Sequence, residues 1–91
     1  MAEVILYGTD WCPFCVRAEQ LLARRGITPE KINLATAPHL REEMERRSGG
    51  RRSVPQIFIG EIHVGGFDDL AELDRRGELD ALLSAHRSKS L

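Results

Sequence analysis

The sequence predicts one α/β domain, built on a mixed four-stranded sheet flanked by helices. Short apolar runs alternate with segments of helical periodicity, which gives the element order β-α-β-α-β-β-α-α. The first β-α-β unit implies two parallel strands joined by a right-handed crossover, and a later pair of adjacent strands adds an antiparallel hairpin. The length of 91 residues fits a single domain over residues 1–91, and 42% hydrophobic content is typical of a globular chain.

The first half of the chain alternates strand and helix patterns. Residues 3–7 predict a buried strand, because the four residues after Glu3 are β-branched, apolar or aromatic. A helix is predicted from Pro13 to about Arg25, because apolar residues recur at spacings of three and four and proline suits a first helical turn. Residues 29–34 predict a second short strand. Thr36 is then the expected N-cap of a second helix over residues 37–47.

The second half begins with the hairpin. Residues 56–59 and 62–65 predict two strands, since both are short apolar runs and a Gly-Glu pair between them suits a tight type II′ turn. Residues 67–75 predict a third helix that carries acidic residues in its first turn. A glycine separates it from a last helix over residues 78–85. From about Arg87 onward a frayed tail is expected.

Charge and hydropathy narrow the function classes. The net charge is −1, so nothing in the composition favours nucleic acid or a membrane surface as a partner. No apolar run approaches the length of a signal core or a membrane span. The expected location is therefore the cytoplasm, where structural disulfides are rare and a close cysteine pair indicates redox or metal chemistry.

Both cysteines lie in the stretch Thr9-Asp10-Trp11-Cys12-Pro13-Phe14-Cys15. Cys12 falls at the N-terminal edge of the predicted first helix, where free N–H groups and the helix dipole favour a thiolate. Cys15 lies one helical turn further in and is expected to be less exposed. We therefore predict that Cys12 attacks a substrate and that Cys15 resolves the resulting mixed disulfide.

Other uses of the cysteine pair remain open from the residues alone. A zinc site needs four ligands, and the three histidines, His39, His63 and His86, are too far apart for a compact finger. Two inert buried thiols are a further alternative. The Val54-Pro55 pair before the third strand bears on this choice. If that peptide bond is cis, the Val54 backbone could face a passing peptide; otherwise Pro55 is an ordinary first residue of a strand.

Three segments together closely resemble the glutaredoxin family, and in particular its bacterial dithiol glutaredoxin 3 type. They are CPFC, SVPQIFI and GGFDDL, in this order and at these separations. The resemblance extends from Val4 to about Leu83. It implies a thioredoxin fold, a cis bond before Pro55, glutathione as cosubstrate, no metal and a monomeric protein.

The resemblance also implies a role for individual residues. The family's nucleophile falls on Cys12 and its resolving cysteine on Cys15. The Val54 backbone would pair with the cysteinyl unit of glutathione, and the segment from Gly66 to Asp68 would hold the γ-glutamyl end. The full glutathione-binding set expected in this way is Thr9, Cys12, Phe14, Arg41, Ser53, Val54, Pro55, Gly66, Phe67 and Asp68.

One position departs from the family pattern. Relatives commonly carry a lysine a few residues before the first cysteine, whereas this chain has Thr9 followed by Asp10. A missing cation beside a retained anion disfavours the Cys12 thiolate. Arginine suits carboxylate recognition, so either Arg41 or Arg52 is expected to contact the glycyl carboxylate instead.

The implied activity is glutathione-dependent thiol–disulfide exchange. Its substrates would be protein disulfides and protein–glutathione mixed disulfides, with ribonucleotide reductase among them. Two alternatives belong to other classes: a dimer that holds an iron–sulfur cluster through Cys12 of two chains, and a thioredoxin-type reductase fed by a flavoenzyme. Pro13 and Cys15 resemble the dithiol enzymes rather than the cluster-binding ones, and Ser53 with the GGFDD segment favours glutathione.

Overall fold

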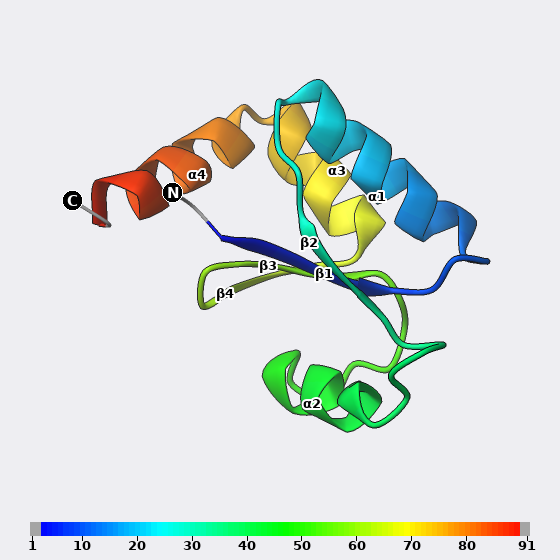
Figure 1. Ribbon diagram of the computed structural model, residues 1–91. Helices are drawn as coiled ribbons and strands as arrows, with labels where there is room; N and C mark the ends of the chain where they lie inside the picture. Colours follow the sequence, from blue (N-terminus) through cyan, green and yellow to red (C-terminus); the bar gives the residue numbers. More distant parts are fainter. Residues whose placement is uncertain (1–2, 90–91) are drawn as a thin grey trace.

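The structure is a computed structural model that describes the backbone of residues 3–89 and the side chains of residues 3–83. Its four strands form one mixed sheet, as the sequence predicts, and the structure places them in the order β2-β1-β3-β4 (Figure 1). β1 runs parallel to β2 and antiparallel to β3, which pairs with β4 as a hairpin. In chain order the elements are β1 (Val4–Gly8), α1 (Pro13–Arg24), β2 (Glu30–Asn33), α2 (Leu40–Arg47), β3 (Gln56–Ile59), β4 (Ile62–Gly65), α3 (Phe67–Arg75) and α4 (Glu78–Lys89).

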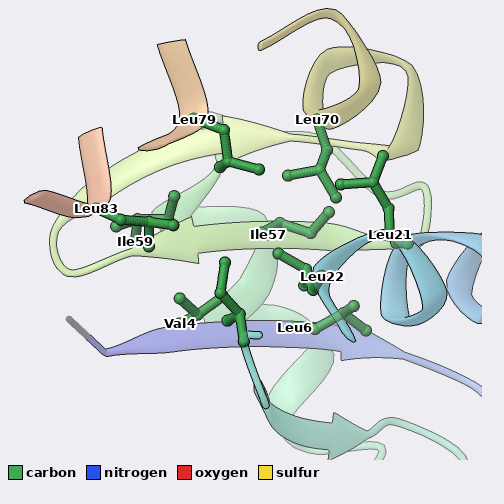
Figure 2. Packing of buried hydrophobic residues seen from close by; sticks show 11 residues of the cluster. Val4, Leu6, Leu21, Leu22, Ile57, Ile59, Leu70, Leu79 and Leu83 are labelled. Atoms are coloured by element: carbon green, nitrogen blue, oxygen red, sulfur yellow. The ribbon is translucent and has the colours of Figure 1, made fainter. Parts of the chain in front are cut away.

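Helices cover both faces of the sheet. α1, α3 and α4 lie on one face and α2 lies on the other (Figure 1). The larger core fills the three-helix face, where β-strand side chains meet leucines from the helices (Figure 2). Because neighbouring residues of a strand point to opposite faces, Leu6 and Ile57 enter this core while Tyr7 and Phe58 enter the other.

The smaller core anchors α2. Tyr7 and Phe58 meet edge to face with ring centroids 5.6 Å apart, and Met44 of α2 packs beside them. The buried Tyr7 hydroxyl accepts a hydrogen bond from Arg47 Nη1 at 2.8 Å and donates one to Glu43 Oε2 at 3.1 Å. Both partners of the phenol come from α2, so packing and polar contacts together hold this helix against the sheet.

The start of α2 differs from the prediction. The helix begins at Leu40, and its N-cap is His39 rather than Thr36. The Thr36 hydroxyl instead donates to the Asn33 carbonyl oxygen at 3.1 Å, within a turn that follows β2. The physical reason is Pro38, because a residue that precedes proline is disfavoured in the α region and Ala37 therefore cannot open the helix readily.

The last helix is longer than predicted. α4 continues to Lys89, past the expected end near residue 85 and through the start of the predicted frayed tail at Arg87. The remainder of that tail, residues 90–91, lies outside the described residues. Across the part of the chain that the structure describes, no helix has both the length and the apolar character needed to cross a membrane.

Candidate functional site

Cys12 is the N-cap residue of α1. Its backbone is extended, with φ −90° and ψ 113°, and Pro13 occupies the first helical position, where its missing N–H costs no helical hydrogen bond. The N–H of Cys15 donates to the Cys12 carbonyl oxygen at 3.1 Å and also to the Cys12 sulfur, at an N···S distance of 3.4 Å. This contact and the helix dipole stabilise negative charge on the sulfur.

Cys15 lies in a different environment from Cys12. Its side chain is fully buried against Gly8, and a Cβ atom on Gly8 would lie only 2.7 Å from the Cys15 sulfur. Burial is the main cause that raises the pKa of the Cys15 thiol to about 12. Cys12 is partly exposed, and both cysteines are free. The two sulfurs are therefore unequal in the direction that the sequence predicts.

A loop distant in the sequence faces Cys12. The Val54–Pro55 peptide bond is cis, which confirms the expectation from the resemblance. The Cys12 thiol donates to the Val54 carbonyl oxygen at an S···O distance of 3.7 Å. This backbone therefore lies directly beside the more accessible sulfur.

A cleft of about 320 Å³ opens beside this loop. Its two walls come from the segment before β3 and from the start of α3, and a Cβ atom on Gly66 would lie 3.4 Å from the Pro55 carbonyl oxygen. The cleft is lined by Phe14, Arg51, Ser53, Val54, Pro55, Gly66, Phe67, Asp68 and Asp69. Cys12 borders this lining through its contact with Val54. Thr9 and Arg41, both in the predicted set, are outside the lining.

The arginine in the cleft is neither of the two that the sequence suggested. Arg41 Nη1 donates to the Arg52 carbonyl oxygen at 3.2 Å, and the Arg52 side chain pairs with Glu45 at 2.9 Å. Arg51 lines the cleft instead. Arg51 and Arg52 are adjacent in the loop between α2 and β3, and the sequence did not reveal which of them would face the cleft.

Asp69 joins Arg51 to the start of α3. Its Oδ2 atom accepts the Gly66 N–H at 3.0 Å and lies 3.3 Å from Arg51 Nη1. The Gly66 hydrogen bond is the first cause, and Arg51 a further one, that lowers the pKa of Asp69. Gly65 has φ +118°, and a Cβ atom there would lie within 2.3 Å of the same oxygen, so the turn requires glycine. Asp68 is also exposed and also lines the cleft.

The negative charge of Asp10, which precedes the cysteines, is balanced by Lys31. Lys31 Nζ lies 3.0 Å from Asp10 Oδ1 and 3.5 Å from Glu19, and Asn33 donates to the other Asp10 oxygen at 2.9 Å. The Lys31 hydrogen bond is the main cause that lowers the pKa of Asp10. Sequence reasoning missed Lys31, because only the parallel pairing of β2 with β1 brings it to this loop.

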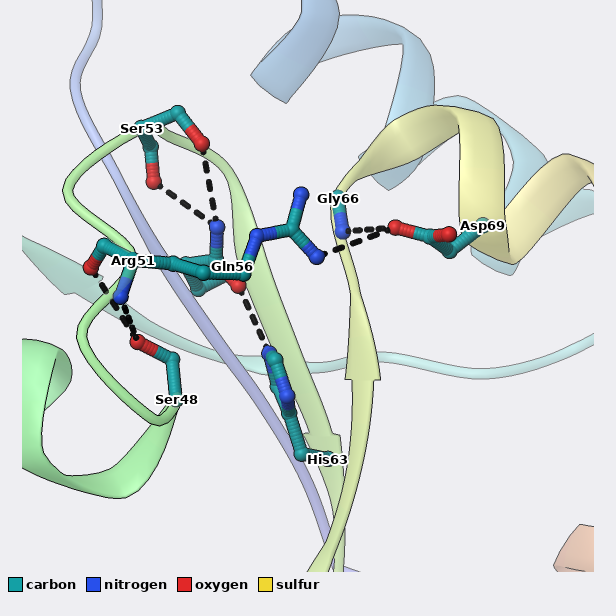
Figure 3. A network of polar contacts seen from close by, with 7 residues as sticks. All are labelled: Ser48, Arg51, Ser53, Gln56, His63, Gly66 and Asp69. Carbon is teal, nitrogen blue, oxygen red and sulfur yellow. Dashed lines mark hydrogen bonds and ion pairs between the residues drawn. The ribbon is translucent and has the colours of Figure 1, made fainter.

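A pair of polar side chains, the buried Gln56 and the partly buried His63, supports the Ser53 side of the cleft (Figure 3). The side chain of Gln56 is fully buried, and its Nε2 atom donates to the Ser53 carbonyl oxygen at 3.0 Å and to the Ser53 hydroxyl at 3.2 Å. His63 Nε2 lies 2.7 Å from Gln56 Oε1. Burial, followed by the charge of Arg51, lowers the pKa of His63.

These two unequal sulfurs, set at a helix start against a cis-proline loop on this sheet, mark the protein as a thiol–disulfide oxidoreductase with the thioredoxin fold. The model of the family described as Glutaredoxin matches residues 4–64. The chain therefore belongs to the glutaredoxin family.

Individual relatives agree with this assignment. The chain is 54% identical to a glutaredoxin of Pseudomonas aeruginosa, over 93% of this chain and 100% of the relative. It is 48% identical to Glutaredoxin 3 of Escherichia coli K12, over 91% of this chain and 99% of that protein. Among solved structures, a buckwheat glutaredoxin–glutathione complex is similar with a TM-score of 0.84 and 26% identity, covering 92% of this chain and 78% of that one.

Proposed function

We propose that this glutaredoxin uses glutathione to reduce protein disulfides and protein–glutathione mixed disulfides through Cys12 and Cys15. The observation that carries this proposal is the cleft of about 320 Å³ that extends from Val54, whose carbonyl oxygen contacts the Cys12 sulfur, to the start of α3. A tripeptide thiol suits such a cleft, because its sulfur would meet Cys12 while its charged ends meet the polar walls. The buckwheat relative was solved as a complex with glutathione, which supports the same ligand here.

The walls provide partners for the cysteinyl and γ-glutamyl parts of glutathione. The Val54 backbone would pair with the cysteinyl unit as an added strand does. The rings of Phe14 and Phe67, with centroids 6.3 Å apart, would flank it. Free N–H groups at the start of α3 suit the γ-glutamyl carboxylate, and Asp68 suits its ammonium group. Arg51 adds a cation at this end of the cleft.

With a mixed disulfide the reaction needs only Cys12. Its thiolate attacks the glutathionyl sulfur, the protein–glutathione S–S bond breaks, and the substrate leaves as a thiolate that takes up a proton. A second glutathione thiolate then attacks the glutathionyl sulfur held on Cys12. This step releases oxidised glutathione and restores the Cys12 thiolate. The Cys15 N–H that stabilises charge on the Cys12 sulfur also makes it a better leaving group.

With a protein disulfide the reaction also needs Cys15. Cys12 attacks one substrate sulfur and forms a mixed disulfide, and the other substrate sulfur leaves as a thiolate. Cys15 must then lose its proton and attack the Cys12 sulfur, which breaks the bond to the substrate and releases its second thiolate. The Cys12–Cys15 disulfide that forms is reduced by two molecules of glutathione, which leave as oxidised glutathione. Burial, the hydrogen bond to Cys12 and the charge of Cys12 all raise the pKa of Cys15. The charge of Cys12 vanishes once Cys12 is in a disulfide, so Cys15 becomes easier to deprotonate at the step that uses it.

Protein substrates would approach over apolar side chains around the nucleophile. Trp11 is 82% exposed, Phe14 49% and Val16 43%, and all three are close to Cys12 in the sequence. We propose that the protein works as a monomer in the cytoplasm, since one chain carries both cysteines and the whole cleft and the cytosol keeps thiols reduced. Ribonucleotide reductase is a candidate substrate through the family resemblance.

The two cysteines give a direct test. We expect Cys12→Ser to abolish glutathione-dependent reduction of a glutathionylated peptide, because the nucleophile is lost. Cys15→Ser should keep most of this activity while losing reduction of a protein disulfide. Turnover can be followed by coupling oxidised glutathione to glutathione reductase. Retained turnover of the peptide in Cys12→Ser would refute the proposal.

A further inference from the structure

The Gln56 amide has a single possible orientation. Its Nε2 atom lies 3.0 Å from the Ser53 carbonyl oxygen, which can only accept a hydrogen bond. The NH₂ group must therefore face Ser53, and Oε1 must face His63 Nε2, 2.7 Å away. Because Oε1 is also only an acceptor, the proton of the neutral His63 ring lies on Nε2. A reversed amide would bury two oxygens against each other, which is costly.

This orientation determines the direction of the Ser53 hydroxyl. Gln56 Nε2 donates to the hydroxyl oxygen at 3.2 Å and carries no lone pair to accept from it. The hydroxyl proton must therefore point away from Gln56. Ser53 lines the cleft, and none of the hydrogen bonds among the described residues uses this proton as donor to another group. The hydroxyl is thus available to donate into the cleft.

We propose that Gln56 and His63 are positioning residues that aim the Ser53 hydroxyl as a hydrogen-bond donor at an acceptor of the glutathionyl group. The proposal rests on the proposed function, since it concerns the same cleft. His63 is well held for this purpose, because its ring stacks on Phe58 with centroids 4.9 Å apart. The pair lies behind the cleft wall and acts on the ligand only through Ser53 (Figure 3).

A double-mutant cycle separates positioning from simple packing. Gln56→Met keeps a similar volume but cannot bind Ser53. We expect it to raise the apparent KM for a glutathionylated peptide roughly two- to tenfold, the value of one hydrogen bond. In the Ser53→Ala background, Gln56→Met should change KM less than twofold, because the hydroxyl that it aims is absent. An equal factor in both backgrounds would overturn the proposal.

Variants of His63 provide an independent test of the proposal. This test remains valid even if Gln56→Met folds poorly. His63→Phe retains a ring to stack on Phe58 but lacks the N–H donor, so it should raise KM as Gln56→Met does. His63→Gln restores an N–H donor and should recover most of the loss. An unchanged KM in His63→Phe, or no recovery in His63→Gln, would contradict the proposal. Melting temperatures of all variants show which of them are folded.

The wild-type protein in the same assay separates this inference from the function on which it rests. No turnover of the glutathionylated peptide by the wild type would overturn the proposed function and the inference together. If the wild type turns the peptide over but Gln56→Met raises KM by the same factor with and without the Ser53 hydroxyl, only the inference is overturned.

Discussion

At the scale of single residues, the difference between the two sulfurs depends on Gly8. The sequence predicts that Cys15 is less exposed than Cys12, from its place one turn into the helix. It did not predict that β1 would pass so close to the sulfur, with 2.7 Å left for a Cβ atom at Gly8. The close approach is a matter of packing between a strand and a helix, which a local sequence pattern does not encode.

Gly8→Ala tests this contact. The added methyl group must displace the Cys15 sulfur or the backbone, so we expect a loss of about 1–3 kcal/mol in the free energy of unfolding, typical of overpacking. In a Cys15→Ala background the sulfur is absent, and most of that loss should disappear. Urea unfolding of the wild type, the two single variants and the double variant gives the cost of Gly8→Ala with and without the sulfur. A cost that is unchanged without the sulfur would place the clash elsewhere.

Arg51 and Arg52 form a matched pair of adjacent residues. Only Arg51 lines the cleft, whereas Arg52 pairs with Glu45 away from it. Arg51→Met should raise KM for a glutathionylated peptide roughly three- to tenfold, since a charge-assisted contact is lost at a partly exposed site. Arg52→Met should change KM less than twofold. The reverse order in steady-state kinetics would favour the arginine expected from the sequence.

At the scale of elements, prediction succeeded where the signal was local. Short apolar runs mark β1 and β3, and spacings of three and four mark α1 and α3. The predicted start of α2 was wrong, because Pro38 and the turn at Asn33 outweighed the capping potential of Thr36. The pairs Asp10–Lys31 and Gln56–His63 could not be predicted, because each depends on how two strands pair: β2 with β1, which brings Lys31 to the Asp10 loop, and β3 with β4.

The packing of α1 leads to a prediction at this scale. Leu22 is fully buried in the larger core (Figure 2), so Leu22→Ala should lower the free energy of unfolding by about 2–5 kcal/mol. Gln20 is exposed on the same helix, and Gln20→Ala should change it by less than about 0.5 kcal/mol. Denaturant unfolding measures both. A loss below about 1 kcal/mol for Leu22→Ala would contradict the packing described here.

At the scale of the whole molecule, ionisation should make the fold sensitive to acid. The pKa of His63 is lowered from 6.5, chiefly by burial, so the folded state prefers the neutral ring. Asp10, Asp69 and Asp74 have pKa values below the ordinary 3.8, chiefly because of hydrogen bonds from Lys31, the Gly66 backbone and Arg25. In both cases the unfolded chain binds more protons than the folded one.

The pH dependence of the melting temperature follows from these signs. The contribution of His63 is complete above pH 6.5 and declines as pH falls from there toward its lower folded pKa. The carboxylate contributions are complete above about pH 4 and decline below it. We expect the melting temperature to fall in two stages, and His63→Phe to remove the first. A melting temperature that rises on acidification from pH 7 to 5 would contradict this expectation.

The β3–β4 hairpin has a consequence for how the chain tolerates change. Its open end carries both walls of the cleft, the Pro55 loop before β3 and Gly66 after β4, whereas its closed end carries only the Gly60-Glu61 turn. Strand pairing, rather than either loop, therefore determines the width of the cleft. The turn is a suitable place to insert a tag or a reporter domain, while a single residue added next to Pro55 or Gly66 would move a wall relative to Cys12.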